Sequence, residues 1–162
     1  AAKTMNFLTE HGISSYGELE SKLTAISARR DTAHTEIKRI ENRAAELALV
    51  MKHAGTYRQL KPIYDRYRKS NDKEKFLRGH ESEIILFEAA ARELKRLGAV
   101  PLPTTESMKT ELTNLAAEKE RLLAEYKAAR TEAQEYETVK QNVDALLTVP
   151  KEQEQQRRHE LE

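Results

Sequence analysis

Apolar residues recur at alternating steps of four and three along two long stretches of this 162-residue chain. Steps that average 3.5 residues return side chains to one face of an under-wound helix, which is the seam of a coiled coil. Such a helix needs a partner, and because the two stretches are comparable in length, we expect them to pack antiparallel on each other. The seam positions are Leu19, Leu23, Ile26, Arg30, Ala33, Ile37, Ile40, Ala44, Leu47, Met51 and Ala54 in the first stretch, and Met108, Leu112, Leu115, Lys119, Leu122, Tyr126, Ala129, Ala133, Tyr136, Lys140, Val143 and Leu147 in the second.

The composition also favours a few long helices. Only 38% of the residues are hydrophobic while 34% are charged, and a globular core of this length would need more apolar residues. Five glycines and four prolines leave little material for turns between many short strands. The sequence therefore predicts an all-α fold, an elongated antiparallel two-helix coiled coil with a small helical head.

Helix start and stop signals divide the chain into five segments. Gly12 is placed to cap the end of a first helix, Ser15 and Glu18 have the spacing of a capping box, and Gly98 is placed to cap a later helix. Thr104 or Thr105 is expected to cap the last helix. The segments are an N-terminal capping helix (1–13), a first coiled-coil arm (14–54), a helical head (55–98), a second arm (104–148) and a disordered tail (149–162).

The head is the segment in which helix breakers are concentrated. Gly55 and Pro62 predict a kink or a break, although apolar residues resume helical spacing as far as about Lys69. Whether the first arm continues through them stays open. We expect a short helix over 73–78 and a longer one over 80–97.

The ends of the chain look unlike the rest. Pro150 is expected to mark the end of order, and Leu161-Glu162 resembles a vector-derived scar. Because the first residue is Ala1 and helix-like sequence follows at once, we expect the chain to be a piece of a longer protein.

Catalytic, metal and membrane functions find no support in the sequence. There is no cysteine, and the five histidines are scattered without the close pair that a helical metal site needs. The sequence has no glycine-rich phosphate loop and no nucleophile elbow. We therefore expect no catalytic residue, metal ligand or cofactor, and no enzyme activity in this chain. No run of about 18 apolar residues and no signal peptide is present, so we expect a cytoplasmic protein without a membrane partner.

Positive charge is concentrated between residues 52 and 80. This stretch has nine basic and three acidic residues, which gives +6 in a chain whose total is +1. Basic residues interleaved with aromatic rings are typical of nucleic-acid contacts. For the charges, phosphate contact and a solvated surface remain alternatives. The candidate nucleic-acid-binding residues are Arg58, Lys61, Arg66, Arg68, Lys69, Lys73, Lys75 and Arg78.

Three tyrosines lie within the basic stretch. Tyr57, Tyr64 and Tyr67 fall at helical spacing. We therefore expect their rings to pack inward, against Phe76, Ile84 and Phe87, more readily than to lie open for nucleic-acid bases.

Several short blocks resemble one protein family in their order and spacing. They cover residues 1 to about 148 and resemble the C-terminal region of relaxase/mobilisation nucleases from conjugative elements of Firmicutes. The blocks are KTMNFLTEHGI at 3–13, YDRYRK at 64–69, KFL at 75–77, HE at 80–81, IIL at 84–86, LPT at 102–104 and VKQNVD at 139–144.

The resemblance implies an accessory role in DNA transfer. The family's N-terminal domain nicks DNA with two histidines, a metal and a tyrosine, whereas this chain has neither a close histidine pair nor a strand-rich region. Tyr57, Tyr64 and Tyr67 are therefore not expected to be nucleophiles. The implied partners are transfer-origin DNA and relaxosome or secretion-channel proteins. The alternative is a structural coiled-coil module that binds a partner helix or a second copy of itself, as a homodimer.

Overall fold

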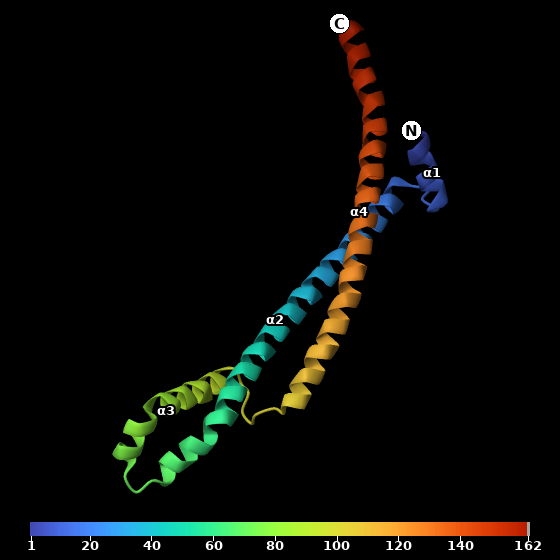
Figure 1. The fold of residues 1–162 in the computed structure, drawn as a ribbon. Coiled ribbons are helices and arrows are strands. Elements are labelled where there is room, and N and C mark those ends of the chain that lie inside the picture. The colour runs from blue at the N-terminus through green and yellow to red at the C-terminus, as the bar shows by residue number, and fades with distance from the viewer. Residues whose placement is uncertain (162) are drawn as a thin grey trace. The chain divides into compact units, whose positions relative to one another are not determined.

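The chain folds into four helices, and no strand occurs among the residues described. The computed structural model describes residues 1–161, without the side chains of 149–154. The helices are α1 (Ala2–Glu10), α2 (Tyr16–Lys69), α3 (Lys73–Arg96) and α4 (Thr105–Leu161), as Figure 1 shows. The predicted all-α class is confirmed.

Each of the two long helices contributes to two compact units. Unit 1 combines Ala1–Ile37 with the part of α4 that begins at Glu120, and unit 2 is Lys38–Lys119. In both units α2 and α4 pack against each other. The two helices are antiparallel in each unit. In unit 1 Tyr16 contacts Asp144 and Arg29 contacts Glu132, and in unit 2 Arg39 contacts Glu118 and Arg43 contacts Glu111.

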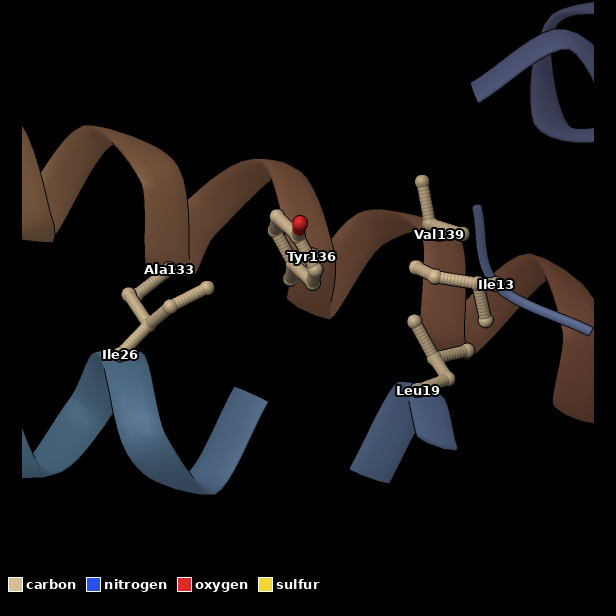
Figure 2. Packing of buried hydrophobic residues seen from close by; sticks show 6 residues of the cluster. All are labelled: Ile13, Leu19, Ile26, Ala133, Tyr136 and Val139. Carbon is tan, nitrogen blue, oxygen red and sulfur yellow. The ribbon is translucent and has the colours of Figure 1, made fainter. Parts of the chain in front are cut away.

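The core of unit 1 lies where the first residues of α2 meet α4 and the residues that follow α1. Figure 2 shows its six buried members, which come from the segment after α1, from α2 and from α4. All except Ile13 belong to the two long helices, and all of these except Val139 are predicted seam positions. The members are Ile13, Leu19, Ile26, Ala133, Tyr136 and Val139, with Phe7, Leu8, Leu23 and Val143 packed against them.

The turn after α1 determines how this helix meets its neighbours. Gly12 has a φ of 64°, a left-handed conformation that favours glycine. The backbone N–H of Gly12 donates to the carbonyl of Thr9, and the N–H of Ile13 donates to the carbonyl of Leu8, which is the Schellman pattern, so the predicted capping role of this glycine is confirmed. The buried Thr4 then accepts a hydrogen bond from Asn142 at 3.2 Å, which joins α1 to α4.

Ser15 caps α2 as predicted, but Glu18 reaches back to Ser14 and not to the N–H of Ser15, so the reciprocal hydrogen bond of the predicted capping box is shifted by one residue. Ser15 Oγ accepts a hydrogen bond from the backbone N–H of Glu18, and the Glu18 carboxylate accepts the N–H of Ser14 at 2.8 Å. This hydrogen bond lowers the pKa of Glu18. The free N–H groups of the first turn are thereby partly satisfied.

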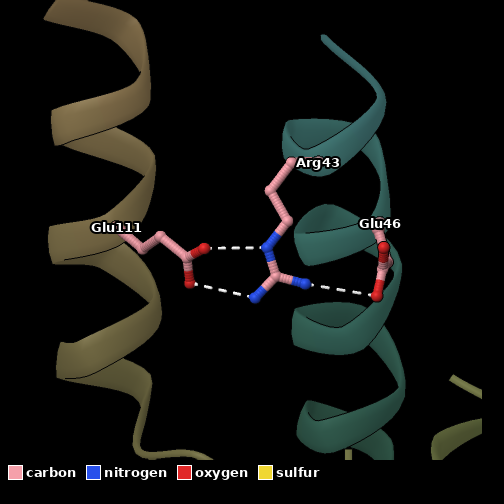
Figure 3. Close-up of polar contacts among 3 residues, drawn as sticks. All are labelled: Arg43, Glu46 and Glu111. Carbon is pink, nitrogen blue, oxygen red and sulfur yellow. Dashed lines mark hydrogen bonds and ion pairs between the residues drawn. The ribbon is translucent and has the colours of Figure 1, made fainter. Parts of the chain in front are cut away.

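In unit 2 an ion-pair cluster joins α2 to α4. Arg43 donates two hydrogen bonds to the carboxylate of Glu111, at 2.7 and 3.1 Å, and a third to Glu46 at 3.2 Å (Figure 3). The hydrogen bond from Arg43 lowers the pKa of Glu111. Such a two-pronged pair fixes the rotation of one helix against the other more tightly than a single contact does.

α2 is continuous through both predicted breakers and ends at Lys69. Pro62 lies inside the helix, and Gly55 is exposed with no atom near the position of a side chain. A break between His53 and Lys61 is therefore excluded, and the alternative that the helix continues to Lys69 is the one observed. A proline costs a helix interior about 3 kcal/mol, and after Pro62 the rings of Tyr64 and Tyr67 lie near Phe87 and Phe76 of α3. The predicted boundary between arm and head at residue 54 consequently falls within one helix.

α3 joins the two helices that the sequence separated. Its residue His80 has non-helical dihedral angles, φ −136° and ψ 26°, so a kink lies where the predicted boundary was. Asp72 caps the helix by accepting the N–H of Lys75 at 3.1 Å, and Gly98, with a φ of 70°, follows its end. Thr104 caps α4 by accepting the N–H of Ser107.

α4 extends further than the sequence indicated. It continues through Pro150 to Leu161, where disorder was expected over 149–162, and Glu162 lies outside the described residues. Lys, Glu, Gln and Arg dominate this tail, and all are strong helix formers. Among residues 1–161, no helix combines the length and the apolar character that crossing a bilayer requires.

Candidate nucleic-acid interface

The eight predicted basic residues all belong to unit 2, on the second part of α2 and the first turns of α3. Their side chains are exposed. Arg66, Arg68 and Lys69 lie in the last turn of α2, and Lys73 and Lys75 lie in the first turn of α3. A turn of three residues therefore separates the two groups of cations.

Short polar contacts hold this turn. The N–H of Ser70 donates to the carbonyl of Tyr67, and Ser70 Oγ accepts the N–H of Asp72 at 3.2 Å. The Asp72 side chain then caps α3. Because the chain reverses within these residues, the cations of both helices lie at one end of the α2–α3 hairpin.

Aromatic rings fill the space between α2 and α3. Phe87 stacks on Tyr57 and on Tyr64, with ring centroids 4.7 and 4.3 Å apart. Tyr67 lies 6.2 Å from Phe76, whose ring stacks on His80 at 4.5 Å. The prediction that the tyrosine rings pack inward is confirmed.

Three of the eight basic residues are held by groups of unit 2. Arg58 donates to the carbonyl of Pro103 at 2.7 Å and to Thr105 Oγ1 at 3.0 Å, which fastens the segment before α4 to α2. Lys61 pairs with Asp65 at 2.9 Å, and this hydrogen bond raises the pKa of the lysine amine. The Arg66 guanidinium lies over the Phe76 ring, 5.6 Å from its centroid. These three contribute to the structure of the hairpin.

The remaining five are the residues best placed to meet a ligand. Within the described part of the chain, none of their side chains has a hydrogen bond or an ion pair. We call them the tip cations: Arg68, Lys69, Lys73, Lys75 and Arg78.

The tip cations of α3 are unfavourably placed for the helix itself. The N-terminus of a helix carries partial positive charge, so a cation in its first turn costs roughly 0.3–1 kcal/mol. Lys73 and Lys75 occupy that turn, where Glu74 is the only acidic residue. Helix stability therefore does not account for the position of these two lysines.

No metal-binding cluster is found in the described residues. No group of three or more His, Cys, Asp or Glu side chains is placed there to hold a metal ion. His80 Nδ1 lies 3.6 Å from Glu83, a distance that suits an ion pair when the ring is protonated. The structural role of Arg58 was missed from the sequence, because its partners lie more than 40 residues away in the chain.

Comparisons with protein-family models, with curated proteins and with solved structures returned no match to this chain.

Proposed function

We propose that this chain is a non-catalytic accessory domain that binds DNA through the tip cations. The observation that carries the proposal is a cluster of five exposed cations without partners in the described chain, whereas the other three candidate residues, Arg58, Lys61 and Arg66, are held by neighbouring groups. Free cations lower the free energy of binding to phosphates because condensed counterions are released. Cations already held in ion pairs would lose a partner on binding.

The parent protein in this proposal is a cytoplasmic DNA relaxase of a conjugative element. The sequence blocks that resemble the C-terminal region of that family support it. Within unit 2, the α2–α3 hairpin would be the head, next to the antiparallel pairing of α2 with α4. Relaxosome or secretion-channel proteins are further partners under this proposal.

A salt titration of DNA binding tests the proposal. Affinity for a 20-base-pair duplex should fall steeply with salt, with a logarithmic slope of about −0.9 for each phosphate contacted. A triple variant, Lys69→Gln, Lys73→Gln and Lys75→Gln, should bind more weakly and lower the magnitude of that slope by about 3.

A matched variant controls for net charge. Lys109→Gln, Lys127→Gln and Arg130→Gln also remove three exposed cations, all of them on α4. This control should retain the affinity and slope of the unmodified protein. If both variants lose affinity equally, or if neither does, the tip cations are not the DNA site.

A coiled-coil interaction module is the second candidate, and exposed residues of α4 favour it. Leu146 and Leu147 are 51% and 57% exposed. Leu147 is a predicted seam position, so the seam continues beyond the residues that α2 covers. A dimer that is indifferent to DNA in sedimentation experiments would support this candidate, whereas a monomer that binds DNA would support the first.

A further inference from the structure

We infer that the tip of the α2–α3 hairpin binds the phosphate backbone of double-stranded DNA and does not stack on the bases of a single strand. The inference rests on the proposed function and specifies its substrate class. It follows from the packing of the aromatic rings, the placement of the tip cations and the width of the hairpin.

The aromatic rings at the tip are occupied by one another. Proteins that bind single strands without sequence preference present aromatic faces on which successive bases stack. Here Phe87 is 5% exposed and lies against both Tyr57 and Tyr64. Phe76 contacts His80 and Arg66. A base could stack on Phe87 only if its contacts with Tyr57 and Tyr64 of α2 were broken, and on Phe76 only by displacing His80 or Arg66.

The tip cations need no such rearrangement. They are exposed on the last turn of α2 and the first turns of α3, and no partner in the described chain has to be released before they bind. In residues 66–78, six basic and two acidic residues give a net charge of +4. One of the two acids, Asp72, accepts the N–H of Lys75 in the N-cap of α3. The tip thus offers point charges on a convex surface.

The width of the hairpin favours contact with the phosphate backbone of DNA over insertion into the major groove. Two packed helices, each about 10 Å across with axes 8–10 Å apart, measure about 20 Å. The major groove of B-DNA is about 12 Å wide. The end of the hairpin is therefore too broad to enter the groove, and its cations would contact phosphates on either side. Such contacts carry little sequence preference.

Anisotropy measurements on the unmodified protein separate the alternatives. The probes are two 20-base-pair duplexes of unrelated sequence, each of their single strands, and a dT20 strand. We expect both duplexes to bind with affinities within about three-fold of each other and at least ten-fold more tightly than any single strand.

A ring variant supplies the second measurement. Tyr67→Leu removes an aromatic face while it keeps an apolar side chain, and a melting curve verifies that the variant folds. Duplex affinity should be unchanged. If bases stack on this ring, single-strand affinity should fall by about five-fold or more.

The outcomes distinguish the inference from the proposed function. Tighter binding to single strands, with a loss in Tyr67→Leu, overturns the inference and leaves DNA binding in place. A duplex preference that depends on sequence overturns the backbone assignment. Binding to none of the probes at 50 mM salt, or tighter binding to vesicles of anionic phospholipid, overturns the proposed function as well.

Discussion

At the scale of single residues, two glycines should respond in opposite ways to the same substitution. Gly55 lies inside α2 with free space at its side-chain position, so Gly55→Ala should stabilise the protein by about 1 kcal/mol. Gly12 also has free space, but its φ is 64°, so Gly12→Ala should destabilise by about 1 kcal/mol. Urea unfolding monitored by circular dichroism measures both changes. Equal shifts in one direction would contradict the assigned backbone conformations.

The Tyr16 hydroxyl makes the stability depend on alkaline pH. It donates to Asp144 at 2.6 Å, and this hydrogen bond, together with desolvation and the charge of Asp144, raises the pKa of Tyr16 from 10.0 to about 12. Because the pKa of Tyr16 is higher in the folded than in the unfolded protein, the protonated hydroxyl stabilises the fold fully at a pH below 10. This stabilisation is lost as the pH rises from 10 to 12. The difference in urea midpoint between the unmodified protein and Tyr16→Phe should therefore be constant below pH 9 and shrink above pH 10. A difference that grows over this range would contradict the assignment.

At the scale of elements, the N-cap of α3 couples helix stability to DNA binding. Asp72→Ala removes the cap and should cost about 1 kcal/mol. Asp72→Asn retains a capping side chain and should change the stability little. Both remove a negative charge beside the tip cations, so both should tighten duplex binding a few-fold at low salt. Urea unfolding and anisotropy, run on the same samples, separate the two effects. If only Asp72→Asn bound the duplex more tightly, and the destabilised Asp72→Ala bound it more weakly, this account would be contradicted.

The sequence predicted most of the helix ends because their signals are local. Gly12, Ser15 with Glu18, Gly98 and Thr104 each cap a helix through residues within five positions along the chain. The continuity of α2 could not be predicted in this way. The local breakers Gly55 and Pro62 point to an interruption, whereas the contacts of Tyr57 and Tyr64 with Phe87 of α3, which are distant in the sequence, are seen only in the folded chain.

The seam pattern failed where a further segment packs against the two long helices. Val139 is off the predicted seam but buried, because it belongs to the cluster that contains Ile13. A helix with neighbours on two sides buries a wider stripe than a two-helix seam. Leu147 is on the seam but 57% exposed, because α2 begins at Tyr16, which already contacts Asp144. The periodicity thus predicted which face is buried, and the contacts of the folded chain determined where burial stops.

Within the candidate site, the sequence predicted the location and the structure selected among the residues. The excess of basic residues between 52 and 80 is visible in the composition alone. The contacts of Arg58 with Pro103 and Thr105 cannot be read from the composition, because the partners are 45 and 47 positions away in the sequence. Only the structure separates the cations that hold the hairpin from the tip cations.

At the scale of the whole molecule, we expect a monomer. Most apolar seam residues of α2 and α4 are buried or partly buried within one chain, and Leu147 is the exposed exception, so little apolar seam surface is left for a second copy to cover. Sedimentation velocity at tens of micromolar should give a single species with the mass of one chain, 18.6 kDa. A stable dimer that Leu147→Lys dissociates would contradict this expectation and favour the interaction module.

The central claim is that DNA lies against the tip cations, and lysine footprinting tests it most directly. The protein is acetylated with and without a saturating 20-base-pair duplex, and the modification of each lysine is measured by mass spectrometry. Lys69, Lys73 and Lys75 should be protected by the duplex, whereas the equally exposed Lys109 and Lys127 should react at unchanged rates. Protection of the α4 lysines, with Lys69, Lys73 and Lys75 still reactive, would contradict the claim.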